Sequence, residues 1–467
     1  MWRLSTLKGS IVFRSAVSLT VLLIACPLVP SGAFAADAHR TPVRPAQSLN
    51  PSRPEPVPAP APQPAARPDM SLADLEGLAL ANNPTLRQAA ANVEAARGRW
   101  VQVGLYPNPM GGYMAGEMGS ESTAGQQGGF ISQDVITGGK LRLNRAIACQ
   151  EIRRLEAEFA AQRGRVLNDV RIQFYEVLVA QRGIELAGEL MRIAEQGRHA
   201  ANKLLEAKEV SRVDVLQADV EFEIAQIQQV NARNRQLSAW RRLAAVVGVP
   251  RMNPVVVRGN LDRLLPQVAW EDAMMRLIAR SPEIASAQAR IGRARFARDR
   301  AVAQPLPNFN IQASVQHDNS TSDDIAGVQI GIPIPVLNRN QGGIRQADAE
   351  IVASRANASR VELLLQTRLA QAFEVYSNAR SQVEAYSTKI LPSARRTVDL
   401  VNSAYRQGEI NFVTSLTAQR TYFQTNIAYL NALMDLRRSE IMIEGMLLSD
   451  SLSASSLEVP ESMIPGP

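Results

Sequence analysis

Histidine and cysteine, the residues that most often bind metals or act as nucleophiles, are scarce in this chain of 467 residues. The histidines are His39, His199 and His317, and the cysteines are Cys26 and Cys149. They are spread over unrelated segments, whereas a structural zinc site needs about four such ligands brought together. A zinc site and a disulfide framework are therefore excluded, and we expect no cofactor.

The chain also lacks the motifs of common catalytic sites. It contains no G-x-S-x-G turn, no H-E-x-x-H helix and no C-x-x-C pair, and Gly138–Lys140 does not have the spacing of a phosphate-binding loop. The segment from His317 to Asp324 carries one histidine and three aspartates that could bind a cation, but a solvated external loop is the favoured interpretation. We therefore expect no enzymatic activity.

Charge narrows the choice of partners. Lys and Arg number 51 against 44 Asp and Glu, which gives a formal net charge of +7. The basic residues are scattered among acidic ones, without the basic blocks and interleaved aromatic residues that are typical of nucleic-acid binders. We expect no nucleic-acid partner.

The first 35 residues have the pattern of an export signal. Basic residues without acids precede the apolar run Ala16–Ala25, which at about ten residues is too short to span a bilayer as a helix. Two processing sites compete: cleavage after Ala35 in an A-x-A pattern, and a lipoprotein-like box in which Cys26 would be acylated. Either one sends the mature protein out of the cytoplasm.

Residues 36–70 are rich in proline, which favours an extended tether that cannot bury a core. After Ser71 no apolar run reaches the length of a transmembrane helix, about 20 residues. Insertion into a membrane would therefore have to use β-strands.

The remainder of the chain is a duplication. Asp74–Pro109 matches Asp272–Pro307 without gaps, with aspartate, alanines and three prolines in register, and Glu209–Ala218 matches Glu409–Ala418 in the same way. Ala-rich helices match one another by composition, but composition does not keep prolines in register. The predicted organisation is a first repeat at 71–250, a linker at 251–268, a second repeat at 269–450 and a tail at 451–467.

Each repeat is predicted to be mainly helical. Ser71 can cap a short helix that ends before Pro84, and a second helix runs from Pro84 to about Gly104. A third helix from Leu141 to about Leu205 would be roughly 100 Å long. Its apolar residues recur every three, four or seven positions, as in a coiled coil.

The partner helix, which begins near Arg212, continues this pattern, so we expect one face of it to be buried as well. Its apolar positions are Val213, Leu216, Val220, Ile224 and Ile227, and those of its copy are Val413, Leu416, Phe423, Ile427, Leu430 and Met434.

Strict alternation predicts β-strands between the helices. Apolar and polar residues alternate over Phe309–Gln316 and Val328–Ile332, which we expect to form a hairpin across the loop 317–324 within about 308–335. Tyr113–Met118 and Gly128–Val135 are the equivalent strands of a first hairpin at about 110–136. The residues predicted to face lipid are Phe309, Ile311, Val315, Val328 and Ile330. Four strands are too few to close a barrel, so closure requires several chains.

These motifs resemble those of the TolC-like outer-membrane efflux proteins, over essentially all of the chain after Ser71. The resemblance rests on Ser71–Pro84, the Pro107–Pro109 junction, Ile332–Gly343, Tyr405–Gly408 and Leu416–Arg420. It implies a mostly α protein with a membrane β-barrel, in which long coiled-coil helices and β-hairpins of three chains form a twelve-stranded barrel and an α-helical tunnel. It also implies an outer-membrane location extending into the periplasm, contact with outer-membrane lipid, and docking onto a periplasmic adaptor and an inner-membrane pump.

Within this family, Gly104–Pro109, Gly138–Lys140 and Asn338–Gly343 look most like the outer-membrane subunits of cobalt-zinc-cadmium efflux systems. The implied function is a passive exit duct for heavy-metal cations. The alternatives are a drug-efflux or type I secretion channel of the same family, and a secreted coiled-coil scaffold without a pore.

The resemblance also implies roles for the turns between the long helices. They correspond to the periplasmic tip, where the adaptor docks, and carboxylates that follow the second turn in family members form an acidic ring that selects cations. Here Thr414 and Thr417 occupy those positions, and only Asp214 of the first repeat is acidic. We therefore expect the gate at Asp214, Thr414 and Thr417. The expected docking residues are Lys208, Glu209, Val210, Ser211, Gln407, Gly408, Glu409 and Val413.

Overall fold

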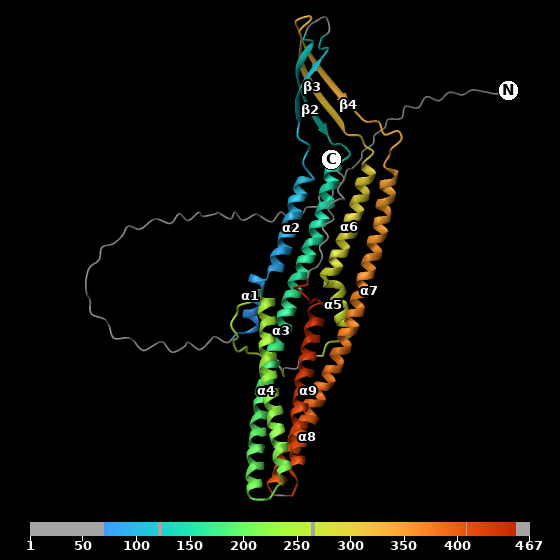
Figure 1. Ribbon diagram of the computed structural model, residues 1–467. Coiled ribbons are helices and arrows are strands. Elements are labelled where there is room, and N and C mark those ends of the chain that lie inside the picture. The colour runs from blue at the N-terminus through green and yellow to red at the C-terminus, as the bar shows by residue number, and fades with distance from the viewer. Residues whose placement is uncertain (1–69, 120–123, 263–266, 408, 454–467) are drawn as a thin grey trace, which may run out of the picture. The chain divides into compact units, whose positions relative to one another are not determined.

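The computed structural model describes residues 70–119, 124–262, 267–407 and 409–453 (Figure 1). All of them belong to one unit of the chain, Pro64–Pro467. The predicted signal peptide with Cys26, the proline-rich segment up to residue 69, Gly408 and the tail from residue 454 lie outside the described residues.

One order of elements occurs twice along the chain: two helices, two strands, and a pair of long helices. The first set is α1 (Leu72–Asn82), α2 (Pro84–Gln102), β1 (Met110–Gly116), β2 (Gln126–Val135), α3 (Lys140–Glu206) and α4 (Arg212–Val247). The second set is α5 (Trp270–Arg280), α6 (Pro282–Ala303), β3 (Phe309–Asp318), β4 (Asp323–Gly331), α7 (Gln341–Ala385), the π-helical turn η2 (Tyr386–Ile390), α8 (Leu391–Arg406) and α9 (Phe412–Glu444).

Local sequence explains where the short helices begin and end. Ser71 caps α1 through a capping box, in which its hydroxyl accepts a hydrogen bond from the Asp74 N–H and the Asp74 carboxylate accepts one from the Ser71 N–H. Pro84 and Pro282 stand at the first position of α2 and α6, where the missing N–H costs nothing. The predicted cap at Ser71 and the helix starting at Pro84 are confirmed.

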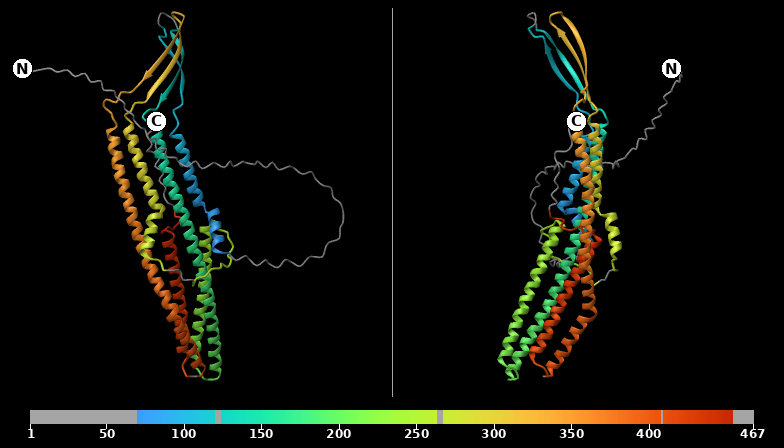
Figure 2. Two further views of the ribbon diagram at one scale, coloured as in Figure 1. Left: turned by 180° about the vertical axis from the view of Figure 1, so that it is seen from behind. Right: turned by 90° about the vertical axis from the view of Figure 1, so that its right-hand side faces the viewer.

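The long helices lie side by side and join the sheet to the opposite end of the unit (Figures 1 and 2). With 67 residues, α3 spans roughly 100 Å and packs against α2, α4, α6 and α9. The corresponding helix of the second half is interrupted after Ala385 by η2, and Pro392 follows in the first turn of α8. The two halves therefore differ in the continuity of their longest helix.

Each half has its own hydrophobic core. The first lies between α1, α3 and α4, around Leu75, Val170, Phe174 and Leu243. The second lies between α5, α7 and α9, where Leu365, Leu369, Tyr376, Leu433 and Leu436 are among the buried residues. The coiled-coil spacing predicted a buried face on this helix, and Val166, Val170, Phe174 and Val177, which follow that spacing, are buried in α3.

The expected burial of the apolar stripe on α4 is wrong for this chain by itself. Val213, Leu216, Val220 and Ile227 are each more than half exposed, and Ile224 is 39% exposed. The face that packs on α3 carries the smaller residues Val215, Ala218 and Ala225, which allow the two helices to approach closely. The larger residues repeat on the opposite face, which has no partner within the described residues.

The strands form one antiparallel sheet in the order β1-β2-β3-β4. The central pair joins the two halves of the chain, because Val135 of β2 lies opposite Phe309 of β3 and Gln126 opposite Asp318. The second hairpin is longer than expected: β4 begins at Asp323 instead of Val328, and Asp323 and Asp324 pair with Asp318 and His317. Backbone pairing thus extends into a polar stretch that shows no alternation.

Candidate functional sites: a two-faced sheet and a helical tip

The register of the sheet sorts its side chains onto two chemically different faces. Val135 lies opposite Phe309, Ile311 opposite Ile330, and Ala313 between Ile131 and Val328. Residues directly opposite one another share a face, so these pairs assemble one apolar surface across three strands. On β1, Tyr113 extends it, because Tyr113 lies opposite Gly129 and Gly129 opposite Val315.

The five strand residues predicted to face lipid all lie on this apolar face. They are Phe309, Ile311, Val315, Val328 and Ile330. Val328 is 77% exposed and Val315 63% exposed, so nothing within the described chain covers them. That lipid covers this face stays a prediction.

The opposite face of the sheet is mainly polar. Gln312 lies between Ser132 and Gln329, and Ser314 and Gln316 follow along β3. Asn310 donates a hydrogen bond to Asp134 across 2.8 Å on the same face. Four large apolar residues also lie on this face: Met110, Met114, Phe130 and Ile325. Phe130 packs over Gly112, where a Cβ atom would lie 2.6 Å from its ring. This face suits contact with water.

Both edges of the sheet are open. In the described part of the chain, β1 pairs only with β2 and β4 only with β3. Backbone N–H and C=O groups along each outer edge therefore lack strand partners, which makes the edges templates for further strands.

None of the described helices is both long and apolar enough to cross a membrane.

The second candidate site is the helical tip, which we define as the turns 207–211 and 407–411 with the first turns of α4 and α9. The turns connect α3 to α4 and α8 to α9, and they lie together at the end of the unit remote from the sheet (Figures 1 and 2). The left-handed backbone of Lys208, with φ of 60°, reverses the chain after α3.

The structure places most of the predicted docking residues at the tip and mostly in solvent. Glu209, Ser211, Gln407, Glu409 and Val413 are exposed. Lys208 and Val210 belong to the turn 207–211. Gly408 lies outside the described residues. What binds to them stays a prediction.

Asp214 helps to cap the start of α4 through its contacts with Ser211. Its carboxylate accepts hydrogen bonds from the Ser211 N–H at 3.0 Å and from the Ser211 hydroxyl at 2.9 Å, while its own N–H donates to that hydroxyl. These contacts form a capping box at the start of α4. The same S-x-x-D spacing appears at Ser71, so the sequence contained this signal.

Asp214 also acts on a residue of the other repeat. Burial, and secondarily the negative charge of Asp214, raise the pKa of Tyr405 on α8. The first turn of α4 and the last turn of α8 are therefore close enough for electrostatic interaction.

Thr414 and Thr417, the other predicted gate residues, are exposed and hydrogen-bond locally. Thr414 donates from its hydroxyl to Asn411, the cap of α9, at 2.7 Å, and Thr417 donates to the Val413 carbonyl at 2.9 Å. About one turn beyond Thr417, Arg420 of α9 forms an ion pair with Glu221 of α4. Sequence reasoning did not identify this pair, because nothing in the helical spacing shows which residues of separate hairpins meet.

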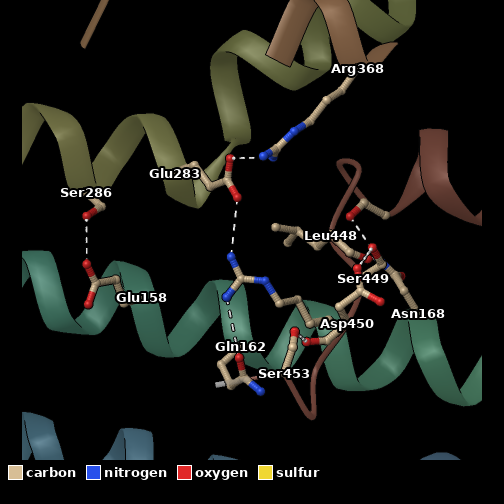
Figure 3. A network of polar contacts seen from close by, with 12 residues as sticks. Glu158, Gln162, Asn168, Glu283, Ser286, Arg368, Leu448, Ser449, Asp450 and Ser453 are labelled. Carbon is tan, nitrogen blue, oxygen red and sulfur yellow. Dashed lines mark hydrogen bonds and ion pairs between the residues drawn. The ribbon is translucent and has the colours of Figure 1, made fainter. Parts of the chain in front are cut away.

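A third polar region lies midway along the helices, where the chain after α9 crosses α3 (Figure 3). Asn168 donates hydrogen bonds to the carbonyls of Gly445 and Leu448 at 2.9 and 2.8 Å, and Asp169 accepts from the Asp450 and Ser451 N–H groups. These contacts hold the end of the described chain against α3.

An ionic network continues from this clamp to the second repeat (Figure 3). Glu283 at the start of α6 pairs with Arg165 of α3 at 3.3 Å and with Arg368 of α7 at 3.4 Å. Glu158 of α3 accepts a hydrogen bond from Ser286 of α6. The network borders a cleft of about 980 Å³ and ties three long helices together at one level. No spacing in the sequence indicated it.

None of these sites has the composition of a metal centre. Within the described ranges, no three His, Cys, Asp or Glu side chains lie close enough to hold a metal ion. Cys149 is buried.

Comparison with known proteins gives one consistent answer. The family model described as outer membrane efflux protein matches residues 75–249 and 274–447, once for each half of the chain. The cobalt-zinc-cadmium resistance protein CzcC of Cupriavidus metallidurans is 28% identical over 79% of this chain and 88% of its own length. The nickel-cobalt-cadmium resistance protein NccC of Alcaligenes xylosoxydans xylosoxydans is 24% identical over 64% of this chain and 68% of its own length.

Solved structures show the same fold at lower identity. The crystal structure of CusC superposes with a TM-score of 0.69 at 20% identity, covering 86% of this chain and 99% of CusC. That of the outer-membrane channel OprN gives a TM-score of 0.68 at 19% identity, covering 81% of this chain and 90% of OprN.

Proposed function

The chain belongs to the outer membrane efflux protein family and is an outer-membrane efflux channel without enzymatic chemistry, and from that premise we propose that three copies form a passive exit duct for heavy-metal cations. In this proposal each copy contributes its four strands to a twelve-stranded barrel, and its long helices to a tunnel that extends into the periplasm. The duct works with a periplasmic adaptor and an inner-membrane pump.

The two-faced sheet with open edges is the observation that carries the barrel proposal. Its apolar face suits lipid and its polar face suits a water-filled lumen, as in transmembrane barrels. A single sheet would leave the edges of β1 and β4 unpaired inside the membrane, where each unsatisfied backbone group costs several kcal/mol. Pairing β4 of one copy with β1 of the next removes every edge.

The exposed stripe on α4 supports the same assembly from the helical side. Val213, Leu216, Val220 and Ile227 follow the spacing of a coiled-coil seam, and each is more than half exposed in one chain. In the proposed trimer a helix of the next copy covers this seam.

The helical tip is the proposed docking and gating region. The exposed residues Glu209, Gln407 and Glu409 present polar groups to an adaptor. Three symmetry copies of Asp214 would place a ring of carboxylates near the narrow end of the tunnel, where a ring of this kind favours cations. The proposed gate consists of Asp214, Thr414 and Thr417.

The choice of heavy-metal cations as cargo is supported by the relatives. The names of both CzcC and NccC refer to resistance to cobalt and cadmium. A protein-secretion relative, the alkaline protease secretion protein AprF of Pseudomonas aeruginosa, is 25% identical over 52% of this chain. The toluene efflux pump outer membrane protein TtgF of Pseudomonas putida covers 80% of this chain at 22% identity, so the support for metal cargo is the higher identity of CzcC, 28% over 79%.

The experiment for assembly measures the mass of the native, detergent-solubilised protein. A particle of three chains that requires detergent, and that conducts ions in planar bilayers, is the expected result. A soluble monomer or dimer would contradict the channel proposal and favour a coiled-coil scaffold.

The experiment for cargo uses a deletion strain. We expect the strain to become sensitive to cobalt, zinc or cadmium, and the wild-type gene to restore resistance. Unchanged metal tolerance, together with loss of a secreted protein or of solvent tolerance, would assign the duct to one of the alternative cargoes.

A further inference from the structure

Exposed arginines surround the junction between the sheet and the long helices. Arg142 lies in the first turn of α3, Arg339 just before α7, and Arg345 in the second turn of α7; all three are exposed. The last turn of α6 and the residues just after it contact the starts of α3 and α7. Lys140 donates a hydrogen bond to the Leu306 carbonyl at 2.5 Å, and Asn340 donates one to the Ala301 carbonyl at 2.8 Å. We call Arg142, Arg339 and Arg345 the junction arginines.

The junction arginines lack acidic partners. No carboxylate of the described residues forms an ion pair with any of the three, and neither α3 nor α7 carries an acidic residue in its first turn. Arg298 at the same level differs, because it pairs with Asp348 at 3.2 Å. The positive charge of the junction arginines is therefore available to an external anion.

Two buried cations add to this charge. Lys140 and Arg300 are each 3% exposed. Lys140 bonds to the Asn308 side-chain oxygen at 2.8 Å and Arg300 to that of Asn144 at 2.9 Å, so both have neutral acceptors. Burial, and secondarily the charge of Arg300, lower the pKa of Lys140. The junction thus has an excess of positive charge in its interior as well as on its surface.

An apolar collar borders the arginines on the side of the sheet. It consists of side chains from the two strand-helix connections that remain at least half exposed: Leu105, Tyr106, Ile332, Ile334, Val336 and Leu337. Exposed apolar side chains next to arginines match the boundary between the hydrocarbon and the headgroups of a bilayer, where tyrosine and basic residues gather.

We propose that the junction arginines bind the phosphate groups of anionic phospholipids in the periplasmic leaflet of the outer membrane. The inference rests on the proposed function for the orientation of the sheet, with its hairpin turns outward and its helices in the periplasm. The collar then lies in the acyl region, and the arginines lie at the level of the phosphates. Bound lipid fixes the depth of the barrel and seals the join between barrel and tunnel.

The test measures lipid retained by the full-length protein after purification in mild detergent containing phosphatidylethanolamine and phosphatidylglycerol. Native mass spectrometry counts the phosphatidylglycerol bound to each assembly. The variant Arg142→Gln/Arg339→Gln/Arg345→Gln is compared with Arg298→Gln, whose arginine already has a carboxylate partner. About fivefold weaker binding for each lost arginine predicts at least a tenfold loss of retained phosphatidylglycerol in the triple variant. Arg298→Gln should retain the wild-type amount.

Equal retention by the triple variant and the wild type would overturn the inference. So would displacement of the bound lipid by millimolar inorganic phosphate, because the arginines would then form a site for free phosphate. Both results leave the channel itself intact. Failure of the proposed function is seen separately, as an assembly that dissolves without detergent.

Discussion

Glu221 of α4 and Arg420 of α9 form an ion pair that joins the first helical hairpin to the second. The Arg420 Nε atom donates to the Glu221 carboxylate at 3.0 Å, and the second guanidinium contact makes the pair bidentate. Glu221 keeps 10% of its side chain exposed and Arg420 keeps 49%. The acid is therefore the partner that depends on the contact, because it is the more buried of the two.

Removing Arg420 should destabilise the hairpins. Arg420→Met leaves the Glu221 carboxylate buried without its counter-charge, and we expect a loss of about 1–3 kcal/mol in the free energy of unfolding. Adding Glu221→Gln should restore part of it. Arg182→Gln is the matched control, since Arg182 and Glu185 are 67% and 63% exposed and such pairs contribute less than about 1 kcal/mol. Thermal unfolding followed by circular dichroism measures all four proteins; equal losses for Arg420→Met and the control would contradict the prediction.

Asp214 should affect ion selectivity through its charge and stability through its cap. Asp214→Asn keeps an oxygen that accepts from the Ser211 N–H but removes the charge, so selectivity for cations should fall while α4 remains capped. Ser211→Ala is the complementary variant: it keeps the charge and loses about 1 kcal/mol of helix stability. The measurement is the reversal potential in a planar bilayer under a salt gradient. An unchanged reversal potential in Asp214→Asn would refute the gate assignment.

An arginine introduced at Val328 should impair membrane insertion, whereas an arginine at its neighbour Gln329 should not. Val328→Arg puts a guanidinium on the apolar face, at a cost of about 2–4 kcal/mol if that face meets the middle of the bilayer. Gln329→Arg puts the same group on the polar face and should insert normally. Membrane-fraction yield and resistance of the assembled protein to heat distinguish the two. Equal yields would show that lipid does not cover the Val328 face.

The phenol of Tyr429 should titrate at a higher pH than an ordinary tyrosine, and the folded protein should lose stability as it does so. It donates a hydrogen bond to Asp262 at 3.0 Å, and burial, followed by the charge of Asp262, raises its pKa to about 12. A folded-state pKa above the ordinary value of 10.0 means that the stabilisation is complete below pH 10 and is lost as the pH rises through about 12. Ultraviolet absorbance of tyrosinate measures the titration.

Two variants test the causes of this shift. Tyr429→Phe should remove the latest tyrosine step and flatten the loss of stability between pH 10 and about 12. Asp262→Asn keeps an acceptor without its charge, so Tyr429 should titrate earlier. A wild-type curve without a step above pH 11 would be inconsistent with the contact.

Asn168 should stabilise the segment that crosses α3. Asn168→Ala removes the hydrogen bonds to Gly445 and Leu448 in a site where Asn168 is 2% exposed, and should cost about 1–3 kcal/mol. Asn202→Ala on the same helix removes one exposed hydrogen bond to Arg198, and should change stability by less than about 0.5 kcal/mol. Unfolding temperatures compare the two variants, and similar shifts would argue against a clamp.

The helices were predictable because their signals are local. A capping serine, a proline at the first helical position and regular apolar spacing placed the ends of α1, α2 and α3 within about two residues. Alternation placed β3 and β4, and their equivalents in the first repeat placed β1 and β2, although β1 spans Met110–Gly116 instead of Tyr113–Met118. The start of β4 was missed, because pairing of Asp323 and Asp324 leaves no apolar pattern.

The polar contacts between separate elements were not predictable in this way. The meeting of Glu221 with Arg420, and of Glu283 with Arg165 and Arg368, depends on how far each helix slides along its neighbour. Periodicity fixes which face of a helix is apolar but leaves this translation open. The α4 stripe was misassigned for a related reason: Val213 and Leu216 show a seam without showing which helix covers it.

The π-helical turn Tyr386–Ile390 changes the phase of the second repeat. A turn of this kind holds one residue more than an α-helical turn, so every side chain beyond it is rotated by roughly 100° about the helix axis. A stripe that faces inward on α7 therefore does not continue in line on α8, and the two segments present independent faces to their neighbours. The unbroken α3 keeps a single phase from the sheet to the tip, so its buried face runs in line along its whole length.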